Sequence, residues 1–437
     1  MKQKLHLAFA FAAFALLASC QKEDAPVPAP TVDAGEIAER VIVGETIEFK
    51  PITQINGDWS KLTYSWTVNG QAQTVTENKF SFTPEARGAY HIVFKADNQG
   101  KIDSAVYDFT VAGAYEDGFF LVNEGWFGHE AGSVTYYPFG ADTVQTWVNK
   151  LANAGKELGT TTQYGHLHNG KMYLISKQGY QGASNLVVAD EFSLKEMANI
   201  ADLPSDGRAF AGVDASRGLM TANSGVYRFD LTTNTLGTTV AGVTGQTGDI
   251  FVNGNYIYLI SSTQGLVILN AADYSIVKTI AGMTIGFVKS NDGKVWAAGG
   301  TKLLSINPTT LDTASVALPF TAFASWGAWQ KGSITYSPDH NAIFIVKQRA
   351  WGSDGNEIFK YTVGGAAPAT FVTYTGKMLY RAIGYSTHLK QLVATTITGF
   401  GQNAQYNDLL FVDPVTAATV KTVTYTGFYF PAMPLFH

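Results

Sequence analysis

Seven copies of one pattern fill the chain from residue 119 to its C-terminus. Each copy is a short apolar run, a turn or loop, a second apolar run, and then Asp or Asn. The first runs are centred near Leu121, Tyr173, Leu219, Ile257, Val295, Ile343 and Leu392, which lie 52, 46, 38, 38, 48 and 49 residues apart. A period of about 45 with four strand-like runs in each repeat is typical of a β-propeller blade. We therefore predict an all-β fold with a seven-bladed β-propeller over 117–437.

The two ends of the propeller predict how the ring closes. The first repeat begins at the strand that corresponds to residues 171–179 of the second repeat, so its innermost strand is missing. The segment Gly427–Phe436 is expected to supply that strand, which would leave no unpaired edge at the seam. Turn residues stand where the first and second strands of several blades should be joined, namely Asn169-Gly170, Asn253-Gly254, Asn291-Asp292-Gly293 and Pro338-Asp339-His340-Asn341.

The loop after the second strand differs in length from blade to blade. It is nearly absent in blades three to five, and long in blades six, seven, one and two, where it spans 347–355, 398–406, 124–132 and 177–183. These four blades are neighbours in a seven-membered ring, and each long loop carries an aromatic residue flanked by Gly. Exposed aromatic side chains on one face favour a binding surface. The alternative is that the loops pack against one another as a lid.

The same face carries the start of each innermost strand. Arg208 and Arg381 occupy matching blade positions there, and each precedes Ala. Two guanidinium groups could hold an acidic or amide-rich ligand, or they could form salt bridges to neighbouring loops. The candidate ligand-binding residues are Trp126, Phe127, His129, Tyr164, Tyr180, Arg208, Trp326, Trp329, Arg349, Trp351, Arg381 and Phe400.

The first twenty residues predict an exported lipoprotein. Lys2 and Lys4 precede an apolar run too short to span a membrane, and Leu17-Ala18-Ser19-Cys20 has the pattern of a lipobox. We predict a signal peptide over 1–19 and lipidation of Cys20, which is the single cysteine of the chain and is a weaker candidate for a nucleophile or metal ligand. Residues 20–35 form a Pro-rich linker.

Residues 36–113 alternate apolar and polar positions in short runs between turn residues, which indicates a small β-sandwich. The segments Tyr64–Gly70, Phe82–Ile92 and Tyr107–Val111 resemble a PKD-type immunoglobulin-like domain. We expect Trp66 to lie in its core and the domain to act as a spacer.

Charge and residue spacing argue against nucleic-acid binding and against catalysis. The formal net charge is −5, and it becomes −7 without residues 1–19, which hold two lysines and no acidic residue. Nucleic acid requires a basic surface that this composition does not provide. His166 and His168 share a strand face, but no carboxylate cluster accompanies them, so a structural role is favoured over a metal site. No nucleophile-elbow sequence is present, and we predict neither a cofactor nor an enzyme.

Two segments carry a resemblance to a known family. Val122–Pro138 and Phe428–Phe436 resemble a Bacteroidota family of lipoprotein propellers related to YncE-like and surface-layer propellers. Gln21–Asp24 is similar to the acidic surface-export signal of such lipoproteins, although a solvated charge run would look the same. Three segments are similar to the O-glycosylation motif of these bacteria, namely Asp103-Ser104-Ala105, Asp142-Thr143-Val144 and Asp312-Thr313-Ala314.

The best-understood relatives are BtuG-type surface lipoproteins, which capture cobalamin and hand it to a TonB-dependent transporter. The resemblance implies an outer-membrane protein that faces the cell exterior, a corrinoid as small-molecule ligand and a transporter as partner. A glycan- or protein-binding adhesion module is the alternative function, and a propeller enzyme acting on a surface glycan is the third.

Overall fold

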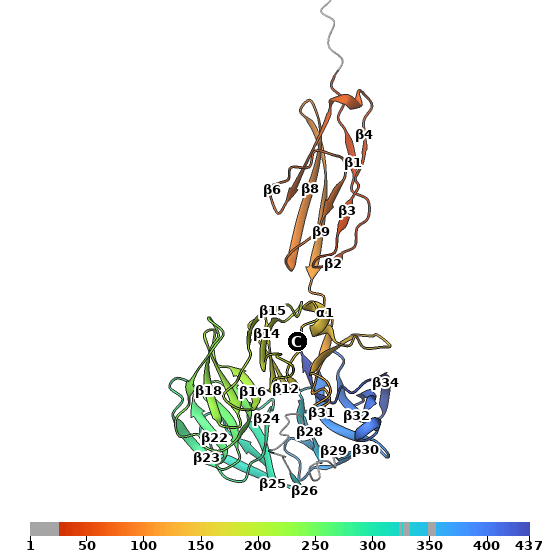
Figure 1. Cartoon of the computed structure of the whole chain (residues 1–437). Helices are drawn as coiled ribbons and strands as arrows, with labels where there is room; N and C mark the ends of the chain where they lie inside the picture. Colours follow the sequence, from red (N-terminus) through yellow and green to blue (C-terminus); the bar gives the residue numbers. More distant parts are fainter. Residues whose placement is uncertain (1–25, 323–325, 327–332, 348–354) are drawn as a thin grey trace, which may run out of the picture. The chain divides into compact units, whose positions relative to one another are not determined.

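The computed structural model describes residues 26–322, 326, 333–347 and 355–437, with only the backbone described at 381 and 382. The chain divides into two compact units, Met1–Ala112 (unit 1) and Gly113–His437 (unit 2). Nearly all secondary structure in the described residues is β (Figure 1). The predicted all-β class is therefore confirmed. None of the helices in the described part of the chain is long and apolar enough to cross a membrane.

Unit 1 is built from short and long strands around an aromatic core. Its elements are β1 (Thr31–Asp33), β2 (Arg40–Ile42), β3 (Ile47–Phe49), β4 (Ile52–Gln54), the 3-10 helix η1 (Trp59–Lys61), β5 (Leu62–Val68), β6 (Gln71–Ala72), β7 (Phe80–Phe82), β8 (Gly88–Asn98) and β9 (Lys101–Ala112). The order β2-β9-β8-β5-β6 forms one sheet, while β3 pairs with β7 and β1 with β4.

Trp66 is the centre of the core of unit 1. Its side chain is fully buried, and its ring lies 4.7 Å from that of Phe94 and 5.2 Å from that of Phe80. The indole Nε1 donates to the backbone oxygen of Glu77 at 2.9 Å, so burial leaves the polar end of the ring paired. The prediction that Trp66 fills this core is confirmed.

Unit 2 contains seven small antiparallel sheets in its described residues. The first holds β10 (Gly118–Asn123), β11 (Ser133–Pro138) and β35 (Pro431–Phe436), and the second holds β12 (Thr160–His168), β13 (Lys171–Gln178), β14 (Leu186–Asp190) and β15 (Glu196–Ile200). The third holds β16 (Gly207–Gly212), β17 (Arg217–Ala222), β18 (Gly225–Asp230) and β19 (Thr235–Thr239), and the fourth holds β20 (Thr247–Asn253), β21 (Tyr256–Ser261), β22 (Gly265–Asn270) and β23 (Ile276–Ile280).

The remaining three sheets follow the same chain order. The fifth holds β24 (Ile285–Lys289), β25 (Val295–Ile306) and β26 (Thr313–Ala322), the sixth β27 (Ile334–Ser337), β28 (Ala342–Lys347), β29 (Glu357–Thr362) and β30 (Ala369–Thr373), and the seventh β31 (Met378–Ser386), β32 (Gln391–Ile397), β33 (Tyr406–Val412) and β34 (Thr419–Thr426). The short helices α1 (Val148–Ala152) and η2 (Gly401–Gln405) lie in loops.

One strand of each sheet contacts its counterparts in the two neighbouring sheets. These inner strands are β35, β12, β16, β20, β24, β27 and β31, and the last contacts the first, so the cycle is closed. Figure 1 shows the labelled strands β12, β16, β24 and β31 toward the middle of unit 2 and β23, β30 and β34 toward its periphery. The arrangement is propeller-like.

The C-terminal strand completes the first sheet. β35 pairs antiparallel with β10, with Phe119 opposite Phe436 and Val122 opposite Met433. Glycines in the two adjacent sheets allow β35 to pack closely. A Cβ at Gly384 would lie 2.6 Å from Cε2 of Phe436, and a Cβ at Gly165 would lie 2.8 Å from Cδ2 of Leu435. The predicted pairing of the C-terminal segment with the first repeat is confirmed.

The predicted turns also fall between first and second strands. Asn169 and Gly170 join β12 to β13 with φ of 52° and 73°, the left-handed conformation that a two-residue hairpin requires. The expected four strands per repeat do not appear in every sheet. β25 runs through Gly299-Gly300 and pairs with β24 in its first half and with β26 in its second, because the loop there is too short to interrupt it.

Candidate functional site

Several inner strands carry a register shift close to their first residues. The pairing shifts near the start of β12, β16, β20 and β31. An extra residue at such a bulge turns its side chain out of the regular alternation, and bulges are common beside functional sites for this reason. The side chains at these shifts carry polar groups and are buried: Gln163, Arg208, Asp249 and Tyr380.

Glu124 connects three of the sheets at this end. It follows β10 directly, and its side chain is buried. Nε2 of Gln163 donates to one carboxylate oxygen at 3.1 Å, and the Tyr380 hydroxyl donates to the other at 3.0 Å. These donors belong to the second and seventh sheets, so one carboxylate ties together the sheets on both sides of the first.

The Arg208 side chain makes a contact between parts of the ring that are not neighbours. Its Nη2 donates to the backbone oxygen of Trp326 at 2.7 Å and to Oε1 of Gln246 at 3.3 Å. Arg208 lies in the third sheet, whereas Trp326 lies in the chain between the fifth sheet and the sixth. Burial lowers the pKa of Arg208, while the nearby charge of Asp206 acts in the opposite direction. The guanidinium therefore lies inside the ring of inner strands.

Tyr164 and Asp249 complete this group on β12 and β20. Both side chains are buried, and Oδ1 of Asp249 accepts from the backbone N–H of Ile250 at 3.0 Å. Burial raises the pKa of Tyr164 well above its ordinary value, and the negative charge of Asp249 raises it further, so the phenol stays protonated. We call the set Glu124, Gln163, Tyr164, Arg208, Asp249 and Tyr380 the inner-strand cluster.

The long loops carry aromatic side chains beside this cluster. The ring of Trp126 lies 4.2 Å from that of His129 and 4.4 Å from that of Phe428. Trp126 also packs against a buried group that includes Tyr380 and Phe430. In the loop after β13, the Tyr180 hydroxyl donates to the backbone oxygen of His129 at 2.7 Å. The loops after the second strands of the first, second and seventh sheets thus contribute to one group of residues, which we call the aromatic rim: Trp126, Phe127, His129, Tyr180, Phe400 and Phe428.

Part of the aromatic rim packs internally and part faces solvent. Phe127 is 61% exposed and Phe400 is 42% exposed, although the Phe400 ring lies 6.3 Å from that of Tyr380. Trp126 and Tyr180 are half-buried in contacts between loops. The two sequence-based alternatives, a binding surface and a self-packed lid, therefore each describe some of these residues.

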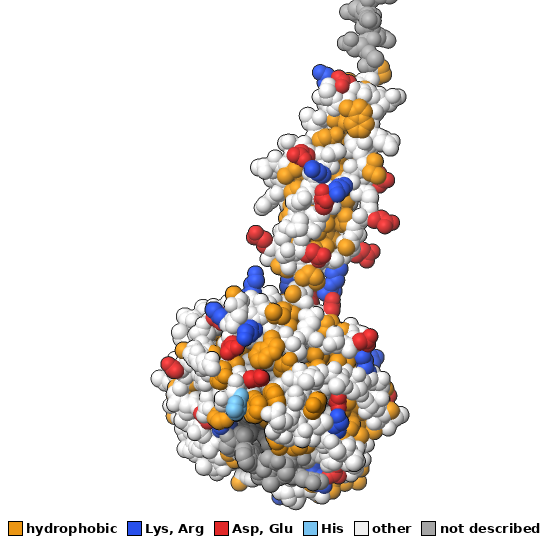
Figure 2. Space-filling model, turned by 45° about the vertical axis from the view of Figure 1, so that its right-hand side comes forward, with side chains coloured by type: hydrophobic (Ala, Val, Ile, Leu, Met, Phe, Trp, Pro, Cys, Tyr) orange, Lys and Arg blue, Asp and Glu red, His pale blue; other side chains and the backbone are white. Residues whose placement is uncertain are grey.

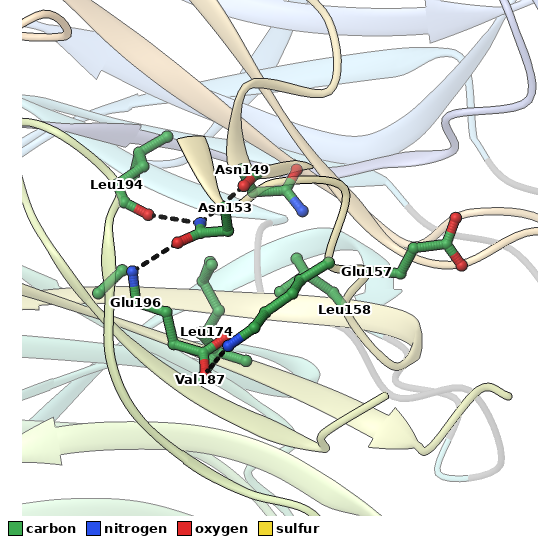
Figure 3. Close-up of a pocket in the computed structure, with 10 residues that line it drawn as sticks. Asn149, Asn153, Glu157, Leu158, Leu174, Val187, Leu194 and Glu196 are labelled. Carbon is green, nitrogen blue, oxygen red and sulfur yellow. Dashed lines mark hydrogen bonds and ion pairs between the residues drawn. The ribbon is translucent and has the colours of Figure 1, made fainter. Parts of the chain in front are cut away.

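The side-chain amide of Asn153 lines a small space beside α1 and bonds to the segments around it (Figure 3). Nδ2 of Asn153 donates to the backbone oxygens of Asn149 at 2.7 Å and Leu194 at 2.8 Å, and its Oδ1 accepts from the N–H of Glu196 at 2.7 Å. The volume of about 10 Å³ has room for about one water molecule. Asn153 is therefore a structural clamp between α1 and the second sheet.

A larger, open hollow adjoins this space. It measures about 450 Å³ and shares Lys156, Glu157, Val187 and Glu196 with the smaller one. Its other wall is the 180–184 loop, which begins with Tyr180. Figure 2 shows Lys and Arg side chains interspersed with Asp and Glu on the visible face of unit 2.

The structure brings together two groups of the predicted ligand-binding residues. Arg208 contacts Trp326, with Tyr164 in the same cluster, and Trp126, His129 and Tyr180 meet in the aromatic rim beside Phe127 and Phe400. Arg381 lies in β31, but its side chain is outside the described part of the chain. Cys20, Trp329, Arg349 and Trp351 also lie outside the described residues.

The structure adds residues that the sequence reasoning missed. Glu124, Gln163, Asp249 and Tyr380 look like ordinary loop or strand-end residues, yet all are buried at the same end of the inner strands. Their signal in the sequence is their position, since Gln163 and Asp249 stand where Arg208 and Arg381 stand in other repeats.

The rings of His166 and His168 stack 6.1 Å apart, and both hydrogen-bond to backbone groups. Nε2 of His166 accepts from the N–H of Gly212 at 3.3 Å, and the His168 ring contacts the backbone oxygen of Asp214 at 2.9 Å. Among the described residues, no three His, Cys, Asp or Glu side chains are grouped so that they could hold a metal ion.

The match to a family model covers residues 117–437, which is most of the chain and all of the repeat region. The chain belongs to the DUF5074 family, described as a domain of unknown function. No curated protein matches this sequence.

Solved structures share the fold of this DUF5074 protein. A quinoprotein alcohol dehydrogenase-like protein from Bacteroides thetaiotaomicron is similar with a TM-score of 0.61 and 18% identity, over 92% of this chain and 97% of the other. Proteins named as candidate 6-phosphogluconolactonases, from Bacteroides uniformis and Bacteroides fragilis, give TM-scores of 0.54 and 0.53 at 13% and 11% identity. Each alignment covers 74% of this chain, and it covers 100% and 99% of the other chain respectively. At these identities the likeness concerns the fold alone.

Proposed function

We propose that this DUF5074 protein is a non-enzymatic surface receptor that captures a corrinoid and passes it to a TonB-dependent outer-membrane transporter. The observation that carries the proposal is the junction of the aromatic rim with the inner-strand cluster. The Tyr380 ring lies 6.3 Å from that of the rim residue Phe400 and belongs to the buried group against which Trp126 packs, while its hydroxyl donates to Glu124 in the cluster. Apolar and polar recognition groups therefore adjoin one another.

A corrinoid suits such a surface because it combines a broad apolar macrocycle edge with many amide groups. The exposed rings of Phe127 and Phe400 would cover apolar parts of the ligand, and their desolvation would stabilise only the bound state. Polar side chains at the start of the inner strands would select for the amides, since an unpaired buried polar group is costly.

The proposal also assigns a role to each of the two units. We take the seven sheets of unit 2 as seven blades of one propeller, closed by β35, and unit 1 as a PKD-type immunoglobulin-like spacer. The BtuG-type resemblance of Val122–Pro138 and Phe428–Phe436 supports this assignment.

The proposal places the mature chain on the cell exterior, lipidated at Cys20. Limited proteolysis of intact cells should digest the protein, and Cys20→Ala should release it from the membrane or strand the precursor. Full protection in cells with an intact outer membrane would contradict surface exposure.

A glycan-binding role is the second candidate, and the open hollow beside Tyr180 favours it. Tyr180, Gln181, Asn199 and Glu196 line that hollow and offer an aromatic face with hydrogen-bonding groups, as sugar recognition requires. A propeller enzyme acting on a surface glycan ranks third, and assays of glycan hydrolysis would test it.

Titration calorimetry against cobalamin, haem and a glycan panel separates these candidates. Submicromolar cobalamin binding that is lost in Trp126→Ala would support the receptor. Glycan binding that depends on Tyr180 and Glu196 would support the second candidate. A folded protein that binds no corrinoid would refute the first.

A further inference from the structure

We infer that Arg208 binds an anionic oxygen group of the captured ligand, either a carboxylate or a phosphate. This inference deepens the proposed capture function and rests on it, because it assigns a ligand chemistry to one residue of the inner-strand cluster. Three observations carry it: the burial of the side chain, its hydrogen-bond count, and the position of the neighbouring charges.

Arg208 is buried, yet only one of its three guanidinium nitrogens makes a hydrogen bond in the described structure. Arg208 is 1% exposed, and its Nη2 donates to the backbone oxygen of Trp326 and to Oε1 of Gln246. Both acceptors of Nη2 are neutral oxygens. Nε and Nη1 have no hydrogen-bond partner within the described structure. A buried cation with unpaired donors destabilises a fold, so a residue of this kind is expected to persist where a ligand completes its bonding.

Two carboxylates at this end of unit 2 have other partners. Asp206 is the acid whose charge acts on Arg208, and it also pairs with Lys177 at 3.7 Å. The Glu124 carboxylate accepts from Gln163 and Tyr380. An arginine that is not neutralised by a bonded carboxylate matches an oxyanion with donors in a planar fork.

The position of Arg208 suits an anion held among the inner strands. It stands at the register shift of β16, and it contacts Gln246, which directly precedes β20, and Trp326. An oxyanion bound there would lie between sheets that are not neighbours in the cycle. In a water-poor environment this charge–charge interaction would contribute more than at the surface.

Thermal unfolding of the full chain with inorganic phosphate or acetate, against chloride at matched ionic strength and pH, tests the inference. At ten times its dissociation constant the bound anion should raise the wild-type midpoint by roughly 2 °C. Arg208→Met should abolish this rise. Arg228→Met, which removes an exposed arginine of β18, should retain it and so controls for the general stabilising effect of phosphate.

The two anions distinguish the two ligand chemistries, since the one that gives the larger Arg208-dependent rise identifies the group bound. If Arg208→Met fails to fold, Arg208→Lys replaces it and should reduce the rise, because ammonium keeps the charge but not the planar fork. An equal rise in wild type and Arg208 variants, or no rise in wild type beyond chloride, would overturn the inference. An Arg208-dependent rise without corrinoid binding would instead refute the corrinoid and keep the anion site.

Discussion

The hydroxyl of Tyr380 donates to a carboxylate oxygen of Glu124 at 3.0 Å, although 256 residues separate them. Glu124 directly follows β10 of the first sheet, and Tyr380 lies near the start of β31 in the seventh sheet. Both side chains are buried. This bond therefore crosses the seam of the ring and links ring closure to the candidate site.

Removing this hydroxyl should weaken unit 2. A hydrogen bond to a buried charged group contributes about 1.5–3 kcal/mol, so Tyr380→Phe should lower the free energy of unfolding by that amount. Tyr406→Phe, at a tyrosine that is 49% exposed, should change it by less than about 0.5 kcal/mol. Urea unfolding of both variants measures the difference. Equal effects would show that the bond across the seam does not stabilise the fold.

A methyl group at Gly384 should disturb closure by β35. The added Cβ would lie 2.6 Å from Cε2 of Phe436 and 2.7 Å from Cγ of Pro434, so the strands must separate. Gly384→Ala is expected to cost about 1–3 kcal/mol, as overpacked core sites do. Gly237→Ala, whose Cβ would have its nearest contact at 3.4 Å, is the matched control. Comparable midpoints for the two variants would contradict tight packing at the seam.

Deleting Phe428–His437 tests the closure as a whole. The truncation removes β35 and leaves β10 as an unpaired edge, so unit 2 should unfold or associate with other copies. Light scattering after gel filtration, together with thermal unfolding, would report both outcomes. A soluble monomer that unfolds cooperatively would count against closure by this strand.

Trp126 should matter more for binding than for folding. Its half-buried ring contacts those of His129 and Phe428, so Trp126→Ala should lower corrinoid affinity at least tenfold, about 1.4 kcal/mol, while the protein stays folded with a cooperative thermal transition. Trp59→Ala in unit 1 removes a tryptophan that is 54% exposed and should leave affinity unchanged. Loss of affinity in both variants would point to a general effect of removing tryptophan.

The contributions of Glu130 and Asp214 to folding stability should change with pH in opposite directions. Burial raises the pKa of Glu130, with Glu157 adding to the rise and His129 opposing it, so its folded pKa lies above the unfolded one. The folded state therefore binds more protons, and this group makes the fold less stable as pH rises through that interval. At pH 7 Glu130→Gln should therefore have a higher urea midpoint than wild type, and this difference should disappear at acidic pH.

Asp214 provides the reverse case. The backbone N–H of Ser216 and the Arg217 side chain lower its pKa, so its contribution to stability is present above the unfolded pKa and is lost as pH falls through the folded one. Asp214→Asn should therefore be less stable than wild type at pH 7, by a small amount because the pair is partly exposed. Urea midpoints across the acid range measure both variants, and parallel pH profiles would contradict the opposite shifts.

The strands and their turns could be predicted because their signals are local. Apolar runs bounded by pairs such as Asn169-Gly170 specify a hairpin within a few residues, and the structure forms β12 and β13 there. Closure by Gly427–Phe436 was also predictable, since a first repeat without its inner strand needs a partner from the other end of the chain. The three-stranded fifth sheet was not, because the continuity of β25 depends on its pairing with two neighbours.

The sequence by itself determined the repeat, the strands and the residues that could meet at one end of them. It placed Arg208 and Trp126 among the candidates because position within the repeat and residue type are visible in one dimension. Only the tertiary structure decided that Gln163 and Tyr380 both donate to Glu124 and that Arg208 reaches Trp326. These contacts join residues 39 to 256 positions apart, and they arise only when ring closure and the register shifts turn buried side chains toward one another.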